Sequence, residues 1–118
     1  MKKVYLCGPM ANLPYFNFPA FFDAEKQLRD RGYEVFNPAK KDIEIFGEGI
    51  ANCPTGTHEE AERIVGRPVT YEECLRIDLN WILDYADCIA LLPGWENSRG
   101  CKVEQALAEC LDLEVINL

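Results

Sequence analysis

Short apolar runs alternate with longer segments of helical periodicity along this chain. Residues 3–7 are apolar on both faces and end at a Gly-Pro pair, which is typical of a central strand in a parallel sheet. Apolar residues then recur at helical spacing over residues 18–31, with Pro19 in the first turn and Gly32 directly after the end. Because residues 33–36 form a second apolar run before another proline, the pattern predicts a β-α-β unit at the start of the chain.

The second half of the chain continues this alternation. Residues 70–85 begin with a capping-box pattern, in which Thr70 precedes Glu73 by three positions. Three further elements are expected: a strand at 87–92, a helix at 99–111 and a strand at 114–118. Since strands that alternate with helices are joined by right-handed crossovers, the prediction is an α/β fold, a three-layer Rossmann-like or flavodoxin-like sandwich with a mostly parallel sheet of four or five strands.

Residues 39–69 interrupt the alternation. They contain four glycines and two prolines, and their pattern offers only a short helix at 57–64. A long insert of this kind inside a compact domain is usually a functional loop. The prediction is therefore one domain, 1–118, in which residues 39–69 form an insert or a lid over a cleft.

Composition and charge narrow the class of protein. Of the 118 residues, 48% are hydrophobic and 27% are charged, which is ordinary for a globular domain. Asp and Glu outnumber Lys and Arg by 20 to 12, and no basic cluster offers a surface for a nucleic acid. The longest apolar run, residues 88–92, is far too short to span a membrane. We expect a cytoplasmic protein with no nucleic-acid polymer and no membrane as partner.

Six cysteines raise the questions of disulfides and metal binding. They form no Cys-x-x-Cys pair, and most lie inside apolar periodic segments, where a free thiol packs as a small hydrophobe. His58 is the only histidine, so the spacing of a zinc site with histidine and cysteine ligands is missing. The expectation is a reduced protein with no metal site and no cofactor. His58, in the insert, is assigned no role.

Two carboxylates fall where a helix is expected to approach the protein interior. Glu104 lies six residues after Ser98, at the border of an apolar stripe formed by Val103, Ala106, Leu107, Cys110 and Leu111. Asp78 lies on the predicted core-facing side of its helix, among Cys74, Ile77, Trp81 and Ile82. A carboxylate that loses hydration at such a position needs a partner or a ligand. Glu104 could also be a solvated border residue, and Asp78 could form an ion pair with Arg76.

These carboxylates and the turn before the last predicted helix suggest one chemistry. Two carboxylates on different helices that meet at a cleft are typical of glycosidic bond cleavage, because one acts at the anomeric carbon while the other manages the proton of the leaving group. At the turn, free N–H groups attract anions, and Ser98 and Arg99 add a hydroxyl and a charge, although N-capping alone would explain the serine. Tyr5 could hydrogen-bond a cleft carboxylate or pack as a core tyrosine.

Three segments together resemble the nucleoside 2-deoxyribosyltransferase superfamily: Val4–Met10, Asp78–Asp87 and Ser98–Glu104. Their order and spacing match across nearly the whole chain apart from the insert. The resemblance implies that Glu104 attacks C1′ of a deoxyribose, that Asp78 assists the departing base and that Tyr5 orients Glu104. It also implies substrate contacts from two loops, at Gly8, Pro9, Met10, Asn97, Ser98, Arg99 and Gly100.

Ser98 indicates one branch of that superfamily. Members that act on nucleosides carry an aspartate six residues before the nucleophile, where it contacts the sugar hydroxyls, whereas this chain carries Ser98 there. The chain is therefore similar to the 2′-deoxynucleoside 5′-monophosphate N-glycosidases, whose serine binds the 5′-phosphate. The expected enzyme cleaves the N-glycosidic bond of a 2′-deoxyribonucleoside 5′-monophosphate through a glutamate nucleophile and releases the free base.

Three alternatives stay open at this point. The protein could exchange bases between nucleosides, as a nucleoside 2-deoxyribosyltransferase does. It could bind and sequester a deoxynucleotide without catalysis, or it could be a scaffold in which both carboxylates face solvent. Members of the superfamily commonly share sites between subunits, so a homodimer or a higher homo-oligomer is expected in each enzymatic case.

Overall fold

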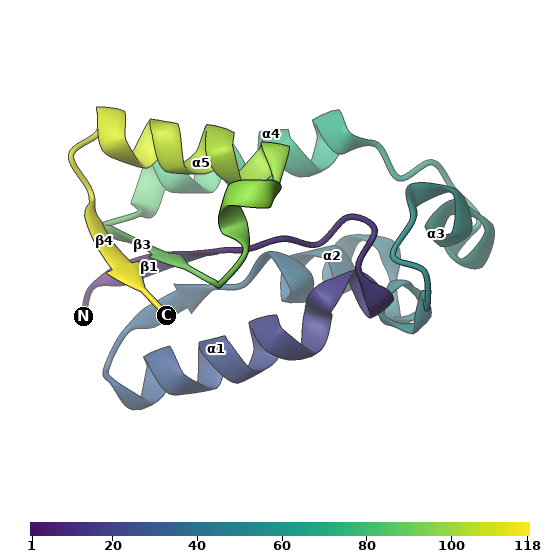
Figure 1. Ribbon diagram of the computed structural model, residues 1–118, viewed down its shortest axis with the longest axis horizontal. Helices are drawn as coiled ribbons and strands as arrows, with labels where there is room; N and C mark the ends of the chain where they lie inside the picture. The colour runs from purple at the N-terminus through teal and green to yellow at the C-terminus, as the bar shows by residue number, and fades with distance from the viewer.

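A computed structural model describes residues 1–118 and contains four parallel strands in one sheet (Figure 1). The strands are β1 (Lys3–Cys7), β2 (Glu34–Phe36), β3 (Cys88–Leu91) and β4 (Glu114–Asn117), in the order β2-β1-β3-β4. Each strand is separated from the next by at least one helix, so every connection is a crossover. The predicted α/β class with a parallel sheet is confirmed, with four strands.

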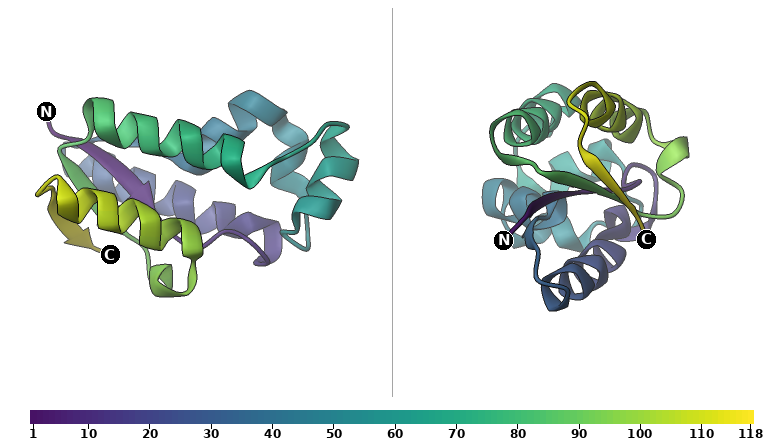
Figure 2. Two further views of the ribbon diagram at one scale, coloured as in Figure 1. Left: turned by 90° about the horizontal axis from the view of Figure 1, so that it is seen from above. Right: turned by 90° about the vertical axis from the view of Figure 1, so that its left-hand side faces the viewer.

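Helices cover both faces of this sheet. Helix α1 (Phe18–Asp30) packs on one face, and α4 (Tyr71–Tyr85) and α5 (Arg99–Cys110) pack on the other (Figure 2). Two further helices, α2 (Pro38–Phe46) and α3 (His58–Val65), belong to the insert, and α3 lies at the end of the molecule opposite both termini (Figure 1). None of the helices has the length and apolar character that crossing a membrane requires.

The alternation of side chains along β1 positions two polar groups on one face. Val4 and Leu6 belong to the larger hydrophobic cluster, which includes the buried face of α1. Tyr5 and Cys7 belong to the smaller cluster, with buried residues of α4 and α5. Because successive side chains of a strand point to opposite faces, Tyr5 and Cys7 both reach helix α5. The hydroxyl and the thiol therefore lie next to Glu104.

The insert contains a helix that the sequence analysis did not predict. Residues 38–46 form α2, which begins at the same Asn-Pro pair that ends β2. Asn37 is its N-cap: the side-chain oxygen accepts a hydrogen bond from the amide of Ala39 at 2.9 Å, and Pro38 occupies the first helical position. The pair therefore ends the strand and starts a helix, and the expectation of a loop here is wrong.

The rest of the insert is attached to the domain by packing and by backbone hydrogen bonds. Four of its apolar side chains are buried in the larger cluster: Ile50, Cys53, Ala61 and Val69. The amide of Asn12 donates to the carbonyl of Gly56 at 2.8 Å, and a Cβ at position 56 would overlap the carbonyl oxygen of Leu13. Glycine at position 56, where φ is +65°, permits this close approach. The insert and the loop after β1 therefore form one continuous wall.

Helix α5 turns a different side inward from the one that its apolar stripe indicated. Glu104 is only 5% exposed and is buried together with Cys101 and Ala108. Val103, by contrast, is 46% exposed and Leu111 is 41% exposed. The expected apolar packing face is therefore wrong. The reason lies in β1, whose polar side chains offset the lost hydration of the Glu104 carboxylate.

Helix α4 also differs from its predicted packing. Of the side chains expected to face the core, only Ile82 is buried. The others are half-buried: Cys74, Ile77, Asp78 and Trp81. The helix extends beyond the carboxyl end of β1, so its first half faces the insert across an open space instead of the sheet. This space is the pocket that contains the candidate chemistry.

Candidate functional site

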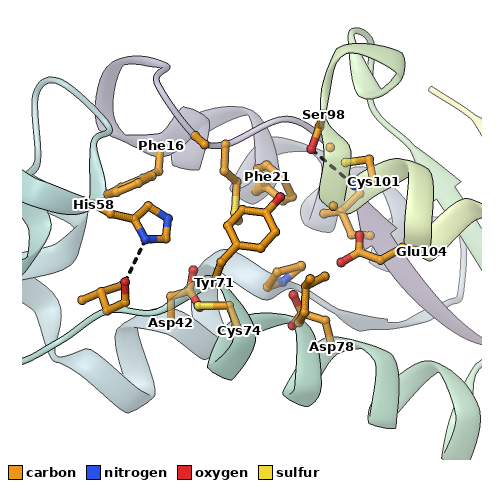
Figure 3. A pocket seen from close by; sticks show the side chains of 18 of the residues that line it. Phe16, Phe21, Asp42, His58, Tyr71, Cys74, Asp78, Ser98, Cys101 and Glu104 are labelled. Atoms are coloured by element: carbon orange, nitrogen blue, oxygen red, sulfur yellow. Dashed lines mark hydrogen bonds between the residues drawn. The ribbon is translucent and has the colours of Figure 1, made fainter.

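A pocket opens where the strand order switches, beyond the carboxyl ends of β1 and β3. Ligands bind at this position in open parallel sheets. Its empty space, counted out to the open mouth, is about 730 Å³, and twenty residues line it. They come from β1 and the loop after it, from α1, from the insert with both its helices, from α4 and from α5 (Figure 3).

Both oxygens of Glu104 are held by donors from β1. The hydroxyl of Tyr5 donates to Oε2 at 2.9 Å, and the thiol of Cys7 donates to Oε1 at 3.3 Å. The Tyr5 ring is fixed in turn by stacking on Phe36, with ring centroids 5.5 Å apart. Because two separate donors define the plane of the carboxylate, its orientation in the pocket is set before any ligand arrives.

Asp78 of α4 lines the same pocket and shares its electrostatics with Glu104. Burial raises the pKa of Asp78 to about 7, and the Tyr5 hydroxyl acts in the opposite direction. Burial also raises the pKa of Glu104, as does the nearby charge of Asp78. Two close carboxyl groups in a poorly hydrated site do not both ionise at neutral pH. The hydrogen bonds from Tyr5 and Cys7 act against the rise in the pKa of Glu104, because they stabilise the charged form of its carboxyl group.

The raised pKa of Asp78 predicts that the empty protein loses stability as the pH rises. An acid with a raised pKa in the folded state contributes full stability below its unfolded pKa, near 3.8, and loses it as the pH passes its folded value of about 7. Calorimetry should therefore give a lower Tm at pH 8 than at pH 5. Asp78→Asn should reduce this fall by several degrees, on the order of the shift that 1 kcal/mol or more produces in a small domain.

Asp84→Asn is the matched control for this measurement. Asp84 lies on the same helix, is exposed and changes the net charge equally when replaced. Equal Tm profiles for the Asp78 and Asp84 variants would contradict the assigned burial of the Asp78 charge.

The start of α5 forms the opposite side of the pocket. Ser98 is the N-cap, and its hydroxyl oxygen accepts a hydrogen bond from the amide of Cys101 at 3.3 Å. The hydroxyl hydrogen is therefore free to donate to a ligand. Tyr71 reaches across the pocket to this turn, because a Cβ on Gly100 would lie 2.7 Å from its hydroxyl oxygen. The turn thus combines the amides of a helix N-terminus with the hydroxyl groups of Ser98 and Tyr71.

The structure brings most of the predicted site residues together in this pocket. The residues among its lining are Tyr5, Gly8, Met10, Asp78, Ser98, Gly100 and Glu104. Pro9, Asn97 and Arg99 do not line it, and the latter two are exposed. No lysine or arginine lines the pocket. Glu104 and Asp78 therefore line one cavity and do not lie on an outer, solvent-facing side.

The sequence analysis missed the pocket residues that the insert supplies. Asp42 of α2 and His58 of α3 both line the pocket, as does Phe16 from the loop after β1. His58 Nδ1 lies 2.8 Å from the carbonyl oxygen of Val69. Because a carbonyl only accepts, Nδ1 carries the hydrogen and Nε2 is unshared. Asp42 could have been found from the Asn-Pro helix start, whereas no local pattern indicated the position of His58.

One group of side chains has the chemistry to hold a metal ion. Cys7, Cys101 and Glu104 are buried, with ligand atoms within 4.8 Å of one another. Two thiols and a carboxylate suit zinc. The contact with Cys101 and burial raise the pKa of Cys7, whereas the hydrogen bond from Cys7 lowers the pKa of Cys101. As a thiol, Cys7 serves as a hydrogen-bond donor to Glu104.

Comparison with known proteins identifies a family and no activity. Neither a curated protein nor a solved structure matches the chain. The model of one family, described as a domain of unknown function (DUF4406), matches residues 2–117. This match covers almost the whole domain, including every strand and helix and all the residues that line the pocket. The chain therefore belongs to the DUF4406 family.

Proposed function

We propose that the protein is an enzyme that cleaves the N-glycosidic bond of a 2′-deoxyribonucleoside 5′-monophosphate and releases the free base. The observation that carries this proposal is the position of Glu104, buried in a pocket with both oxygens held and with Asp78 in the same cavity. The resemblance of three segments to the nucleoside 2-deoxyribosyltransferase superfamily supports the same assignment. Within that superfamily, Ser98 resembles the serine of the 5′-monophosphate N-glycosidases.

The first step forms a covalent sugar–enzyme intermediate. The Glu104 carboxylate attacks C1′ of the deoxyribose, and the bond between C1′ and the base nitrogen breaks. Asp78 donates its proton to the departing base, which leaves as a neutral molecule. A pKa near 7 suits this role, because Asp78 is then partly protonated at neutral pH and still acidic enough to give the proton up.

The second step releases the sugar. Asp78, now ionised, accepts a proton from a water molecule, and the water oxygen forms a bond to C1′. The bond between C1′ and Glu104 breaks, which restores the carboxylate and its hydrogen bonds to Tyr5 and Cys7. The products are the free base and 2-deoxyribose 5-phosphate, and both carboxyl groups return to their starting protonation states.

Incubation with a panel of deoxynucleoside 5′-monophosphates and deoxynucleosides tests the proposal. Chromatography of the mixture should show free base from at least one monophosphate, and a Glu104→Ala sample run in parallel should show none. If the wild-type protein and Glu104→Ala release base equally well, the site assignment is wrong. Full recovery of a tightly bound, intact nucleotide would instead favour a protein that sequesters its ligand.

Base exchange between nucleosides is the second candidate function. One observation favours it: no lysine or arginine lines the pocket, so no basic side chain there would be left without a partner when the substrate lacks a phosphate. The chemistry at Glu104 would be unchanged, with a second base in place of water in the second step. Offering a deoxynucleoside together with a different acceptor base separates the two functions, because only exchange forms the new nucleoside.

Replacing Ser98 should separate nucleotide from nucleoside substrates. Ser98→Asp places a negative charge at the start of α5, where the proposed phosphate binds, so kcat/KM for the monophosphate should fall by about a hundredfold. The deoxynucleoside lacks the phosphate, and its kcat/KM should change by less than about threefold. Ser98→Ala, which removes the hydroxyl without adding charge, should give an intermediate loss. Equal losses for both substrates would contradict the assignment.

A homo-oligomer is also proposed for this protein. Helices α4 and α5 lie against each other on one face, and they leave Leu83 56% exposed and Val103 46% exposed. A contiguous patch of exposed apolar side chains is typical of a protein interface, and the proposal takes these two side chains to belong to one. We expect a dimer in sedimentation experiments that Val103→Glu converts to a monomer. Val115→Glu, an exposed position on β4, should leave it intact. A monomeric wild-type protein at micromolar concentration would contradict this proposal.

A further inference from the structure

Asp42 is a carboxyl group in the pocket that the proposed reaction does not use. It lies on α2, in the insert, and lines the same cavity as Asp78 and Glu104. Burial raises the pKa of Asp42 well above its ordinary value, as does the nearby charge of Asp78, and neither a cation nor a hydrogen-bond donor compensates. A poorly hydrated polar group without a partner is costly. No hydrogen bond or ion pair within the protein occupies the Asp42 carboxyl group, which in its protonated form offers one donor and one acceptor to a ligand.

The order of side chains along the pocket relates Asp42 to the reacting bond. Asp78 and Cys74 are one helical turn apart on α4, so they lie on the same face of that helix. Cys74 and Asp42 line the same pocket, and the pKa of Cys74 is raised by burial and, to a smaller extent, by Asp42. Figure 3 shows Glu104 at one end of the pocket, Asp78 next to it, and Asp42 beyond Cys74 toward His58. A base that leaves a sugar at Glu104 and passes Asp78 therefore extends toward Asp42.

Aromatic side chains border the pocket around Asp42. The ring of His58 stacks on Tyr71, with centroids 6.0 Å apart, and meets the edge of Phe16 at 6.2 Å. All three side chains line the pocket. Flat aromatic surfaces beside a single carboxyl group suit a planar heterocycle whose edge carries a hydrogen-bond donor next to an acceptor.

We propose that Asp42 binds the edge of the nucleobase through two hydrogen bonds, as a base-recognition residue supplied by the insert. This inference rests on the proposed function, since it takes the sugar to lie at Glu104. The O–H of the Asp42 carboxyl group donates to an acceptor on the base, and its carbonyl oxygen accepts an N–H. With adenine, the acceptor is a ring nitrogen and the N–H belongs to the exocyclic amine. Asp42 is a binding residue in this scheme and takes no part in proton transfer to the leaving group.

Two substrates and two variants test this role. The substrates are 2′-deoxyadenosine 5′-monophosphate and the same nucleotide with unsubstituted purine as its base, which lacks the amine. For the wild-type protein, kcat/KM should be about tenfold higher with adenine, because the second hydrogen bond is lost with purine. Asp42→Leu should bring this ratio to within about twofold of one. Asp42→Asn should keep it, since an amide also offers one donor beside one acceptor.

The ratio separates recognition from a structural effect. A variant that only disturbs the pocket slows both substrates alike and leaves the ratio unchanged. Glu44→Leu is the matched control, because Glu44 lies two positions away on α2 with its side chain 59% exposed, and this variant should keep the wild-type ratio. The inference would be overturned if Asp42→Leu kept the wild-type ratio of adenine to purine kcat/KM, or if this ratio fell to about one in Asp42→Asn.

The design also distinguishes failure of the inference from failure of the proposed function. If the wild-type protein releases base and only the ratio fails to respond to Asp42→Leu, the proposed function stands and the inference falls. If no base is released from any substrate, the proposed function falls. The same ratio is then measured as relative affinity, by calorimetric titration of both nucleotides into Glu104→Gln and into Glu104→Gln with Asp42→Leu. An adenine preference that disappears with the carboxyl group supports the inference, and any other result overturns it.

Discussion

Glu104→Gln should reduce the rate of base release by at least about a thousandfold, which is the scale of loss expected when a catalytic nucleophile is removed. Glutamine keeps the volume of the side chain, and its one carbonyl oxygen can accept the hydrogen bond of Tyr5 or of Cys7, while its amide group faces the other. It lacks the charge and the nucleophilic oxygen, however, and forms no bond to C1′. The loss should appear in kcat, with little change in substrate affinity.

Single-turnover measurement of base release, with a parallel binding titration, checks this expectation. Glu109→Gln is the matched control, since Glu109 lies on the same helix, is exposed and carries the same charge. It should keep the wild-type rate. A Glu104→Gln protein that binds nucleotide normally and still releases base within tenfold of the wild-type rate would remove Glu104 from the mechanism.

Asp78→Asn should lower kcat by about a hundredfold to ten-thousandfold, which is the usual contribution of a general acid. The asparagine side chain retains the shape of the aspartate but has no proton to give to the departing base. In the wild-type protein, kcat should fall as the pH rises above about 7, because Asp78 then loses the proton that it donates. This alkaline decline should be absent in Asp78→Asn.

The leaving group provides the sharpest readout for Asp78. A substrate whose leaving group departs readily as an anion needs little protonation. With such a substrate, Asp78→Asn should therefore lower kcat by a smaller factor. A merely structural role would slow good and poor leaving groups alike. Asp84→Asn, exposed on the same helix, should show neither effect. An unchanged alkaline decline in Asp78→Asn would assign that pKa to another group.

The strands, and the helices that pack on the sheet, could be predicted from the sequence because local patterns determine them. The apolar runs in β1 and β3 indicate strands buried on both faces, and Thr70 caps α4 as expected, accepting a hydrogen bond from the amide of Glu73 at 3.2 Å. The carboxylates were found for a related reason. An acidic residue inside an otherwise apolar helix pattern, such as Asp78, is a local irregularity that can be read without knowing the fold.

The remaining features depend on contacts between distant segments. Glu104 was placed at the border of an apolar stripe, yet it is buried, because Tyr5 and Cys7 meet it from a strand almost a hundred residues away in the chain. The wall formed by the insert likewise depends on the packing of Gly56 against Leu13. Hydrophobic periodicity contains no information on either contact, so the contribution of His58 to the pocket could not be predicted.

Trapping the sugar on the protein tests the role of Glu104 most directly. A 2′-deoxy-2′-fluoro-arabinonucleoside 5′-monophosphate carries the same leaving base as the natural substrate. Its fluorine slows the hydrolysis of the covalent intermediate more than it slows the formation of that intermediate. After incubation and digestion, mass spectrometry should find the peptide containing Glu104 heavier by one fluorinated sugar phosphate, and Glu104→Gln should show no adduct. Base release from the natural substrate together with an adduct on another residue, or with none, would contradict the account.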